Sequence, residues 1–177
     1  EQNSDICFPP LQKAKDPTHP QKVCFCDPVF LEFGSAWNRY TAPMMQTVVA
    51  GGEPSAEMRR VHDGCRRIVD TLLTSIRPGV TFDQAAQNAE KALQPLAGKV
   101  FFSGVFGYTV GAQFPPSWVE GSGFIARGGN VEFRPGMVFH LPICLRIPGQ
   151  WGIGCSETIL VTDAGAEPIT DNPWTLG

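Results

Sequence analysis

The sequence has few of the features that would place it in a membrane or on nucleic acid. No apolar run approaches the roughly 18–20 residues that span a bilayer. No positively charged start precedes an apolar segment, so we expect no signal peptide. Lys and Arg number 14 against 17 Asp and Glu. They form no basic cluster of the kind that binds nucleic acid or anionic lipid. We therefore expect a cytoplasmic protein that binds neither membrane nor nucleic acid.

The chain also lacks an initiator Met and any pair of metal-binding motifs. It opens on polar, Pro-containing sequence, so we expect a processed or cut chain. Cys24 and Cys26 have no second Cys/His pair at zinc-finger spacing. An even count of six cysteines would suit disulfides in a small secreted domain. This chain is neither small nor visibly secreted, so we expect reduced thiols.

The residues that are present predict an α+β domain. Hydrophobic residues make up 42% of the 177 residues, enough for one domain with a core. Residues 1–22 hold four prolines and little periodicity, which predicts a loop. Strand-forming residues predict a hairpin over about 28–36 and 40–50, and Gly51-Gly52 ends it.

Two helices are expected next. Apolar residues follow the 3.6-residue period from Met58 to Ile76, after Pro54-Ser55 and before Pro78-Gly79. Thr81 and Gln84 form a capping box for a second helix, which ends near Pro95. Strand-like runs then recur at 100–106, 137–146 and 151–162. This order predicts a curved antiparallel sheet backed by helices.

Three segments carry a resemblance to a known family. They are Ile76–Thr81, Phe133–Phe139 (FRPGMVF) and Glu157–Glu167 (ETILVTDAGAE). In this order they resemble the turn after the long helix, the start of a central strand and the final strand of the creatinase, prolidase and aminopeptidase P family. The resemblance implies the pita-bread fold, with 1–177 as the C-terminal part of a catalytic domain. It also implies upstream helices and an N-terminal domain before residue 1, supplied by the same polypeptide or a partner chain, and a homodimer.

The family's metal ligands are replaced in this sequence. Metal-dependent members hold two ions with two Asp, one His and two Glu. By resemblance, these positions fall on Glu32, Pro43, Tyr108, Pro142 and Ser156. Divalent metals need carboxylate oxygens or imidazole nitrogens, and proline side chains offer no donor atom. We therefore expect no metal and no other cofactor.

A closer likeness is to the ectoine hydrolases of this family, which are also regarded as metal-independent. Arg39–Pro43 (RYTAP), Gly107–Trp118 (GYTVGAQFPPSW), Met137–His140 (MVFH) and Ser156-Glu157 resemble segments of those enzymes. Three residues depart from the pattern. Thr41 stands where His is expected, Gln46 where Arg is expected, and Gly154 where an acid is expected.

Four residues are candidates for catalysis. Glu32 lies in an apolar strand, where burial would raise the pKa of a catalytic acid/base or nucleophile; a solvated edge residue is the alternative. His140 shares a strand face with Pro142, a former ligand position, although a satisfied core histidine is the alternative. Tyr108 would donate a hydrogen bond to the substrate, or it is structural filling. His19 lies where creatinase-like members keep a catalytic His, or at the surface.

Six further residues are candidates for substrate binding. The residues of the Pro-rich loop would line a small apolar pocket or merely make the loop rigid. Glu157 is the remaining carboxylate of the final strand, but it points away from the site unless a bulge intervenes. The six are Tyr40, Thr41, Pro115, Pro116, Trp118 and Glu157.

The sequence thus predicts a hydrolase that opens a C–N bond in a small polar substrate, a cyclic amidine, amide or guanidino compound. Glu32 would be the nucleophile or base, His140 would shuttle protons, and Tyr108 would orient the substrate. Two alternatives stay open. One is a biosynthetic cyclase or isomerase on the same scaffold, and the other is a non-catalytic relative that binds a ligand or serves as a scaffold.

Overall fold

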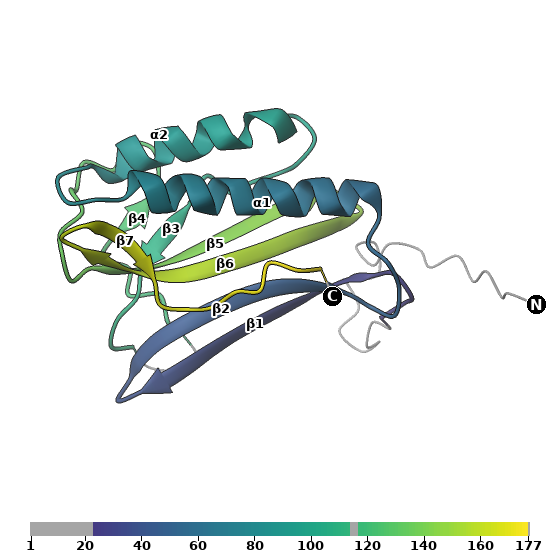
Figure 1. Ribbon diagram of the computed structural model, residues 1–177, viewed down its shortest axis with the longest axis horizontal. Coiled ribbons are helices and arrows are strands. Elements are labelled where there is room, and N and C mark those ends of the chain that lie inside the picture. Colours follow the sequence, from purple (N-terminus) through teal and green to yellow (C-terminus); the bar gives the residue numbers. More distant parts are fainter. Residues whose placement is uncertain (1–22, 114–116, 177) are drawn as a thin grey trace, which may run out of the picture.

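The computed structural model describes residues 23–113 and 117–176 (Figure 1). The predicted loop 1–22 lies outside the described residues. The first element pair is the predicted hairpin, β1 (Pro28–Trp37) and β2 (Tyr40–Val49), which pair antiparallel. Asn38 and Arg39 connect the strands with φ of 48° and 71°. Two central residues with positive φ give the turn a twist that matches that of the strands.

The two predicted helices are confirmed with their caps. α1 (Ala56–Ser75) begins after Ser55, whose hydroxyl accepts from the Met58 amide. α2 (Phe82–Leu93) begins with the predicted capping box between Thr81 and Gln84, and a short 3-10 helix, η2 (Gln94–Leu96), follows it. Both helices cover one face of the larger sheet (Figure 1).

That sheet has five antiparallel strands in the order β4-β3-β5-β6-β7. Two of its strands, β5 (Val138–Ile147) and β6 (Trp151–Thr162), match the expected runs. The strand expected at 100–106 is wrong: Phe101 makes only an isolated bridge to Arg146, and Gly104 breaks the run with φ +85°. The short strands are β3 (Gly107–Thr109), β4 (Phe124–Ile125) and β7 (Gly165–Pro168).

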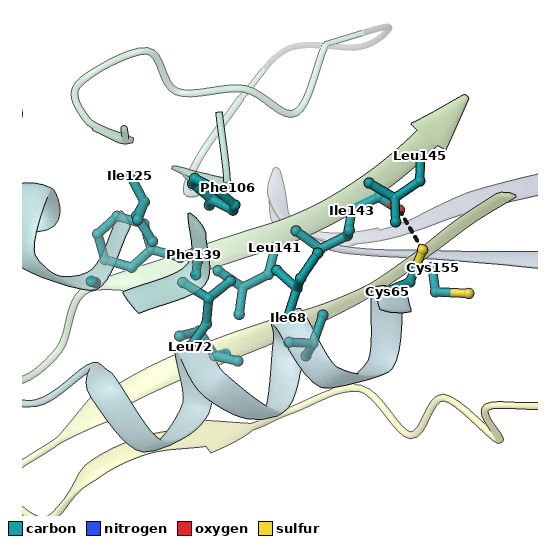
Figure 2. Packing of buried hydrophobic residues seen from close by; sticks show 14 of the residues in the cluster. Cys65, Ile68, Leu72, Phe106, Ile125, Phe139, Leu141, Ile143, Leu145 and Cys155 are labelled. Carbon is teal, nitrogen blue, oxygen red and sulfur yellow. Dashed lines mark hydrogen bonds between the residues drawn. The ribbon is translucent and has the colours of Figure 1, made fainter. Parts of the chain in front are cut away.

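The core lies between the helices and the central strands. Along β5, alternate residues are fully buried and face α1, as the period of a strand requires. Figure 2 shows these β5 side chains against Cys65, Ile68 and Leu72 of α1. The β5 residues are Phe139, Leu141, Ile143 and Leu145. The intervening residues of β5, His140 among them, therefore face the other side of the sheet.

The hairpin lies on that other side (Figure 1). It is a separate two-stranded sheet, so the expected curved sheet is divided in two. Side chains rather than a backbone ladder join β2 to β6. Ser156 Oγ accepts from the Met45 amide at 2.6 Å, and Thr47 Oγ1 both donates to and accepts from the Gly154 backbone. The result is three layers: helices, five-stranded sheet and hairpin.

The structure also bears on membrane-spanning helices and on the state of the cysteine thiols. No helix among residues 23–113 and 117–176 is long and apolar enough to cross a bilayer. The thiols of Cys26, Cys65, Cys144 and Cys155 are free. Cys24 is disulfide-bonded, so the expectation of reduced thiols throughout is wrong at this position.

Candidate active site

The candidate site lies where the inner face of the hairpin meets the hairpin-facing side of the five-stranded sheet. His140 of β5 pairs across the strands with Thr158 of β6, and paired residues share a face. On β1, Glu32 lies on the same face as Phe30, whose ring packs on Gly154 of β6. The two sheets thus bring Glu32 and His140 together from 108 positions apart in the sequence.

Glu32 and His140 form the centre of the site. The Glu32 Oε1 atom lies 4.0 Å from His140 Nε2, with His140 fully buried and the Glu32 side chain 39% exposed. Burial raises the pKa of the Glu32 carboxyl. Burial also lowers the pKa of His140 to about 3, outweighing the opposite effect of a hydrogen bond to the Pro43 carbonyl. At neutral pH His140 is therefore neutral.

The contacts that hold His140 are on the Nδ1 side of its ring. Its Nδ1 atom lies 3.1 Å from Thr158 Oγ1, and Thr158 Oγ1 lies 2.5 Å from the Pro43 carbonyl oxygen of β2. Its Nε2 atom is buried and has no hydrogen-bond partner among the described residues. A buried polar atom without a partner is uncommon in folded proteins. This unpartnered nitrogen faces the Glu32 carboxyl group.

Tyr108 and Trp118 complete a wall beside this pair. The rings of Tyr108 and His140 lie with centroids 5.5 Å apart. The Trp118 indole N–H donates to the Tyr108 hydroxyl at 3.0 Å, which leaves the phenol proton free to donate elsewhere. The indole lies against Gly34, where an added Cβ would stand 3.0 Å from its ring. Burial is the main cause that raises the pKa of Tyr108, and the charge of Glu32 adds to it.

The predicted substrate-binding residues divide between the two sides of their strands. Thr41 shares the inner face of β2 with Pro43, and its buried hydroxyl oxygen has no hydrogen-bond partner among the described residues. Tyr40 is the preceding residue, faces the other way and is 68% exposed. His19, Pro115 and Pro116 lie outside the described residues.

Glu157 lies on the helix-facing side of the sheet. It pairs with Leu141, whose side chain is in the core, and β6 has no bulge at this point. Its carboxylate oxygens accept from the Thr170 hydroxyl and the Trp174 indole N–H. Burial is the main cause of its raised pKa. We therefore leave Glu157 out of the site, since it binds the C-terminal segment instead.

Two residues of the site were absent from the sequence prediction. Thr158 contacts His140 directly, and Cys144 lies on the same face of β5, where burial raises the pKa of its thiol to about 11. The strand period alone would have placed Cys144 beside His140 and Pro142. Thr158 requires the register between two strands, which the sequence does not state.

Comparison with known proteins places this chain in a family. The model of metallopeptidase family M24 matches residues 6–163, so the chain belongs to this family. It is 30% identical to an ectoine hydrolase of Halomonas elongata, over 83% of this chain and 36% of that protein. It is 26% identical to a probable dipeptidase PepE of Mycobacterium tuberculosis, over 71% of this chain and 32% of that one.

Solved structures agree on the fold. Dipeptidase PepE from Mycobacterium ulcerans superposes with a TM-score of 0.78 at 25% identity, over 91% of this chain and 43% of that chain. The prolidase from Pyrococcus horikoshii gives 0.74 at 21% identity, over 84% and 41%. The pita-bread fold is thereby confirmed. The chain spans less than half the length of each of these relatives.

The residues present do not fit the metal centre that the family name implies. The side chains of Pro43 and Pro142 carry no donor atom, and Ser156 Oγ already accepts from a backbone amide at 2.6 Å. In residues 23–113 and 117–176, no group of three or more His, Cys, Asp or Glu side chains is placed to hold an ion. No catalytic step is therefore derived through a metal.

Proposed function

We propose that the protein is a metal-independent hydrolase that opens a C–N bond in a small polar molecule. The observation that carries the proposal is the pair of Glu32 and His140: Glu32 Oε1 lies 4.0 Å from His140 Nε2, which has no hydrogen-bond partner among the described residues. Membership of a hydrolase family supports hydrolysis as the reaction class. The likeness to ectoine hydrolase supports a cyclic amidine, amide or guanidino substrate.

Glu32 is the general base in this proposal. A separation of 4.0 Å is too long for a direct hydrogen bond, but it lets one water or N–H group contact both side chains. The carboxylate takes a proton from the water as the water oxygen bonds to the C=O or C=N carbon of the substrate, whose π electrons move to the heteroatom. The C–N bond then breaks, and the protonated Glu32 returns the proton to the leaving nitrogen. A raised pKa suits a carboxyl group to both steps.

His140 and Tyr108 orient the reactants. A histidine whose pKa is about 3 carries protons poorly, so we assign His140 the role of a hydrogen-bond acceptor rather than the expected proton shuttle. The Tyr108 hydroxyl accepts from Trp118 and donates its own proton to the substrate. The Thr41 hydroxyl, which has no hydrogen-bond partner among the described residues, would contact a polar group of the same molecule.

The substitution Glu32→Gln tests the proposal. The amide keeps the size of the side chain but removes its charge and basicity. We expect kcat to fall by at least about 100-fold on an active compound from a panel of ectoine-like and creatine-like molecules. We expect an unchanged Tm, since an amide is easier to bury than a carboxylate.

Glu53→Gln is the matched control, because the Glu53 side chain is 89% exposed and belongs to the loop between β2 and α1. It should keep wild-type kcat and Tm. Wild-type turnover by a folded Glu32→Gln protein would end the case for this carboxylate. Tight binding of a panel compound without any turnover by the wild type would favour the non-catalytic, ligand-binding alternative.

A further inference from the structure

A chain of three polar groups ends on the side of His140 that faces away from Glu32. His140 Nδ1 lies 3.1 Å from Thr158 Oγ1, which lies 2.5 Å from the Pro43 carbonyl oxygen. His140 and Thr158 are both 0% exposed, so no solvent competes for these contacts. The three groups come from β5, β6 and β2, and they cross from the five-stranded sheet to the hairpin.

The chemistry of the groups fixes the direction of both hydrogen bonds. A carbonyl oxygen only accepts, so the single hydroxyl proton of Thr158 points to Pro43. The hydroxyl oxygen is then left as an acceptor toward the imidazole, and His140 Nδ1 must carry the donated proton. A neutral imidazole has one N–H. Its other nitrogen, Nε2, is therefore an acceptor with a free lone pair.

The Nε2 lone pair lies on the side of His140 that faces Glu32. Nε2 has no partner among the described residues, and Glu32 Oε1 at 4.0 Å is also an acceptor when ionised. Two acceptors at this distance leave a place for a group with hydrogens to donate. A water molecule or an amine of the substrate has two such hydrogens, one for each acceptor.

We propose that Thr158 is a positioning residue that holds His140 as the Nδ1–H tautomer, so that Nε2 accepts a hydrogen bond from the reacting water or substrate. The tautomer follows from the contacts alone, and its use in turnover rests on the proposed function. Without the Thr158 hydroxyl, the Nδ1–H group loses one of its two acceptors and keeps only the Pro43 carbonyl oxygen. The imidazole then gains by moving its proton to Nε2 and donating it to a water that also contacts the Glu32 carboxylate, and Nε2 is no longer an acceptor for the reacting group.

Thr158 also ties β6 to the hairpin, so a substitution there has a structural effect that must be separated from its effect on His140. Thr47 offers a matched control. It is likewise 0% exposed, and its hydroxyl joins β2 to β6 through the Gly154 backbone at 2.8 and 2.9 Å. Thr47→Val removes a buried hydroxyl that bridges the same two strands, but it touches neither nitrogen of His140.

The test combines NMR with kinetics on the full-length protein. In protein labelled with 15N-histidine, the two ring nitrogens report which one carries the proton. We expect protonated Nδ1 and unprotonated Nε2 in the wild type, in Thr158→Ser and in Thr47→Val. In Thr158→Val we expect the proton on Nε2. We also expect kcat to fall by about 10- to 100-fold in Thr158→Val. Thr158→Ser should recover most of this loss, because it restores the hydroxyl.

The outcomes separate this proposal from the proposed function. A wild-type His140 protonated on Nε2, or a Thr158→Val protein that keeps the Nδ1–H tautomer, would overturn the proposal whatever the activity. A loss of turnover equal in Thr158→Val and Thr47→Val would reduce Thr158 to a structural tie. If the wild type turned over no compound, the proposed function would fail, while the 15N signals would still decide the tautomer.

Discussion

Single residues determine which chemistry is left to this site. Proline at positions 43 and 142 removes two carboxylates that metal-dependent relatives would be expected to use, and the resemblance alone identifies these positions.

We predict that the full-length protein, purified without added metal, contains no stoichiometric zinc, manganese or iron. Turnover should be unchanged after dialysis against a chelator, because the proposed steps use only side chains. Elemental analysis and activity assays check this. One or more equivalents of metal bound at Glu32 would contradict it.

The buried His140 makes stability depend on pH. Its pKa is about 3 in the folded protein, whereas an unfolded histidine titrates near 6.5. Between these values the unfolded chain binds a proton that the folded chain does not, so stability falls as pH drops below about 6.5. Above that pH both states are neutral at this residue, and it contributes no slope.

We predict that His140→Asn reduces this acid-side loss of stability. Urea unfolding of the wild type and the variant at about pH 7 and pH 5 gives the two free-energy differences. The wild type should lose more stability over this interval than the variant does. Equal losses would show that His140 does not stay neutral in the folded protein.

How well the sequence predicted the contacts of single residues depended on how far apart the contacting residues lie in the chain. The period of a strand placed His140 on the same face as Pro142, as the structure has it. Glu157 was a candidate for substrate binding that needed a bulge to face the site, and β6 has no bulge there. The Glu32–His140 pairing came from the family resemblance, since no local pattern joins residues of two separate sheets. Thr158 was missed because its contact depends on the register of β5 against β6.

At the level of elements, local sequence patterns reveal few of the contacts that attach the hairpin to the five-stranded sheet. The sequence predicted both long helices, the hairpin, β5 and β6, because each has its own periodicity or capping residues. It missed β3, β4 and β7, which are two to four residues long and are defined by their partners. It also gave no sign that β2 joins β6 through side chains.

The C-terminal segment provides one such attachment. Asn172 is 5% exposed, and its Nδ2 atom donates to the carbonyl oxygens of Met45 and Ser156, both at 3.0 Å. We predict that Asn172→Ala destabilises the protein by about 1–3 kcal/mol, since two buried acceptors lose their donor. The substitution should increase the rate of hydrogen exchange more in β1 and β2 than in α1, because the hairpin loses a contact with β6.

Gln46→Ala is the control for this prediction. Its side-chain amide also reaches the C-terminal segment, at the Thr175 carbonyl, but the bond is long at 3.3 Å and exposed to solvent. We expect less than about 0.5 kcal/mol of destabilisation. Equal effects of the two substitutions on stability and exchange would argue against Asn172 as a specific tie.

For the whole molecule, the outer face of the hairpin is the surface that most needs an explanation. Alternation along β1 places Phe33 and Trp37 on this face, and Tyr40 stands opposite Trp37 in the pair. These side chains are 60%, 81% and 68% exposed. Large aromatic residues gathered on one face of a two-stranded sheet are typical of a surface that another part of the protein covers. A hairpin alone is also marginally stable in water.

We predict that a segment preceding residue 1 of the same polypeptide covers this face. The chain spans 36% of the matched ectoine hydrolase, which leaves ample length in such a protein for the covering segment. Residues 1–177 expressed alone should then unfold without a single cooperative transition, and the fluorescence of Trp37 should be that of an indole in water. In the full-length protein the Trp37 emission should shift to shorter wavelength, and Trp37→Ser should lower the Tm. The Trp37→Phe variant provides the spectral difference that isolates this residue.

A stable monomer of residues 1–177 that unfolds cooperatively would contradict the prediction. A stable dimer of that fragment would assign the face to a second copy instead.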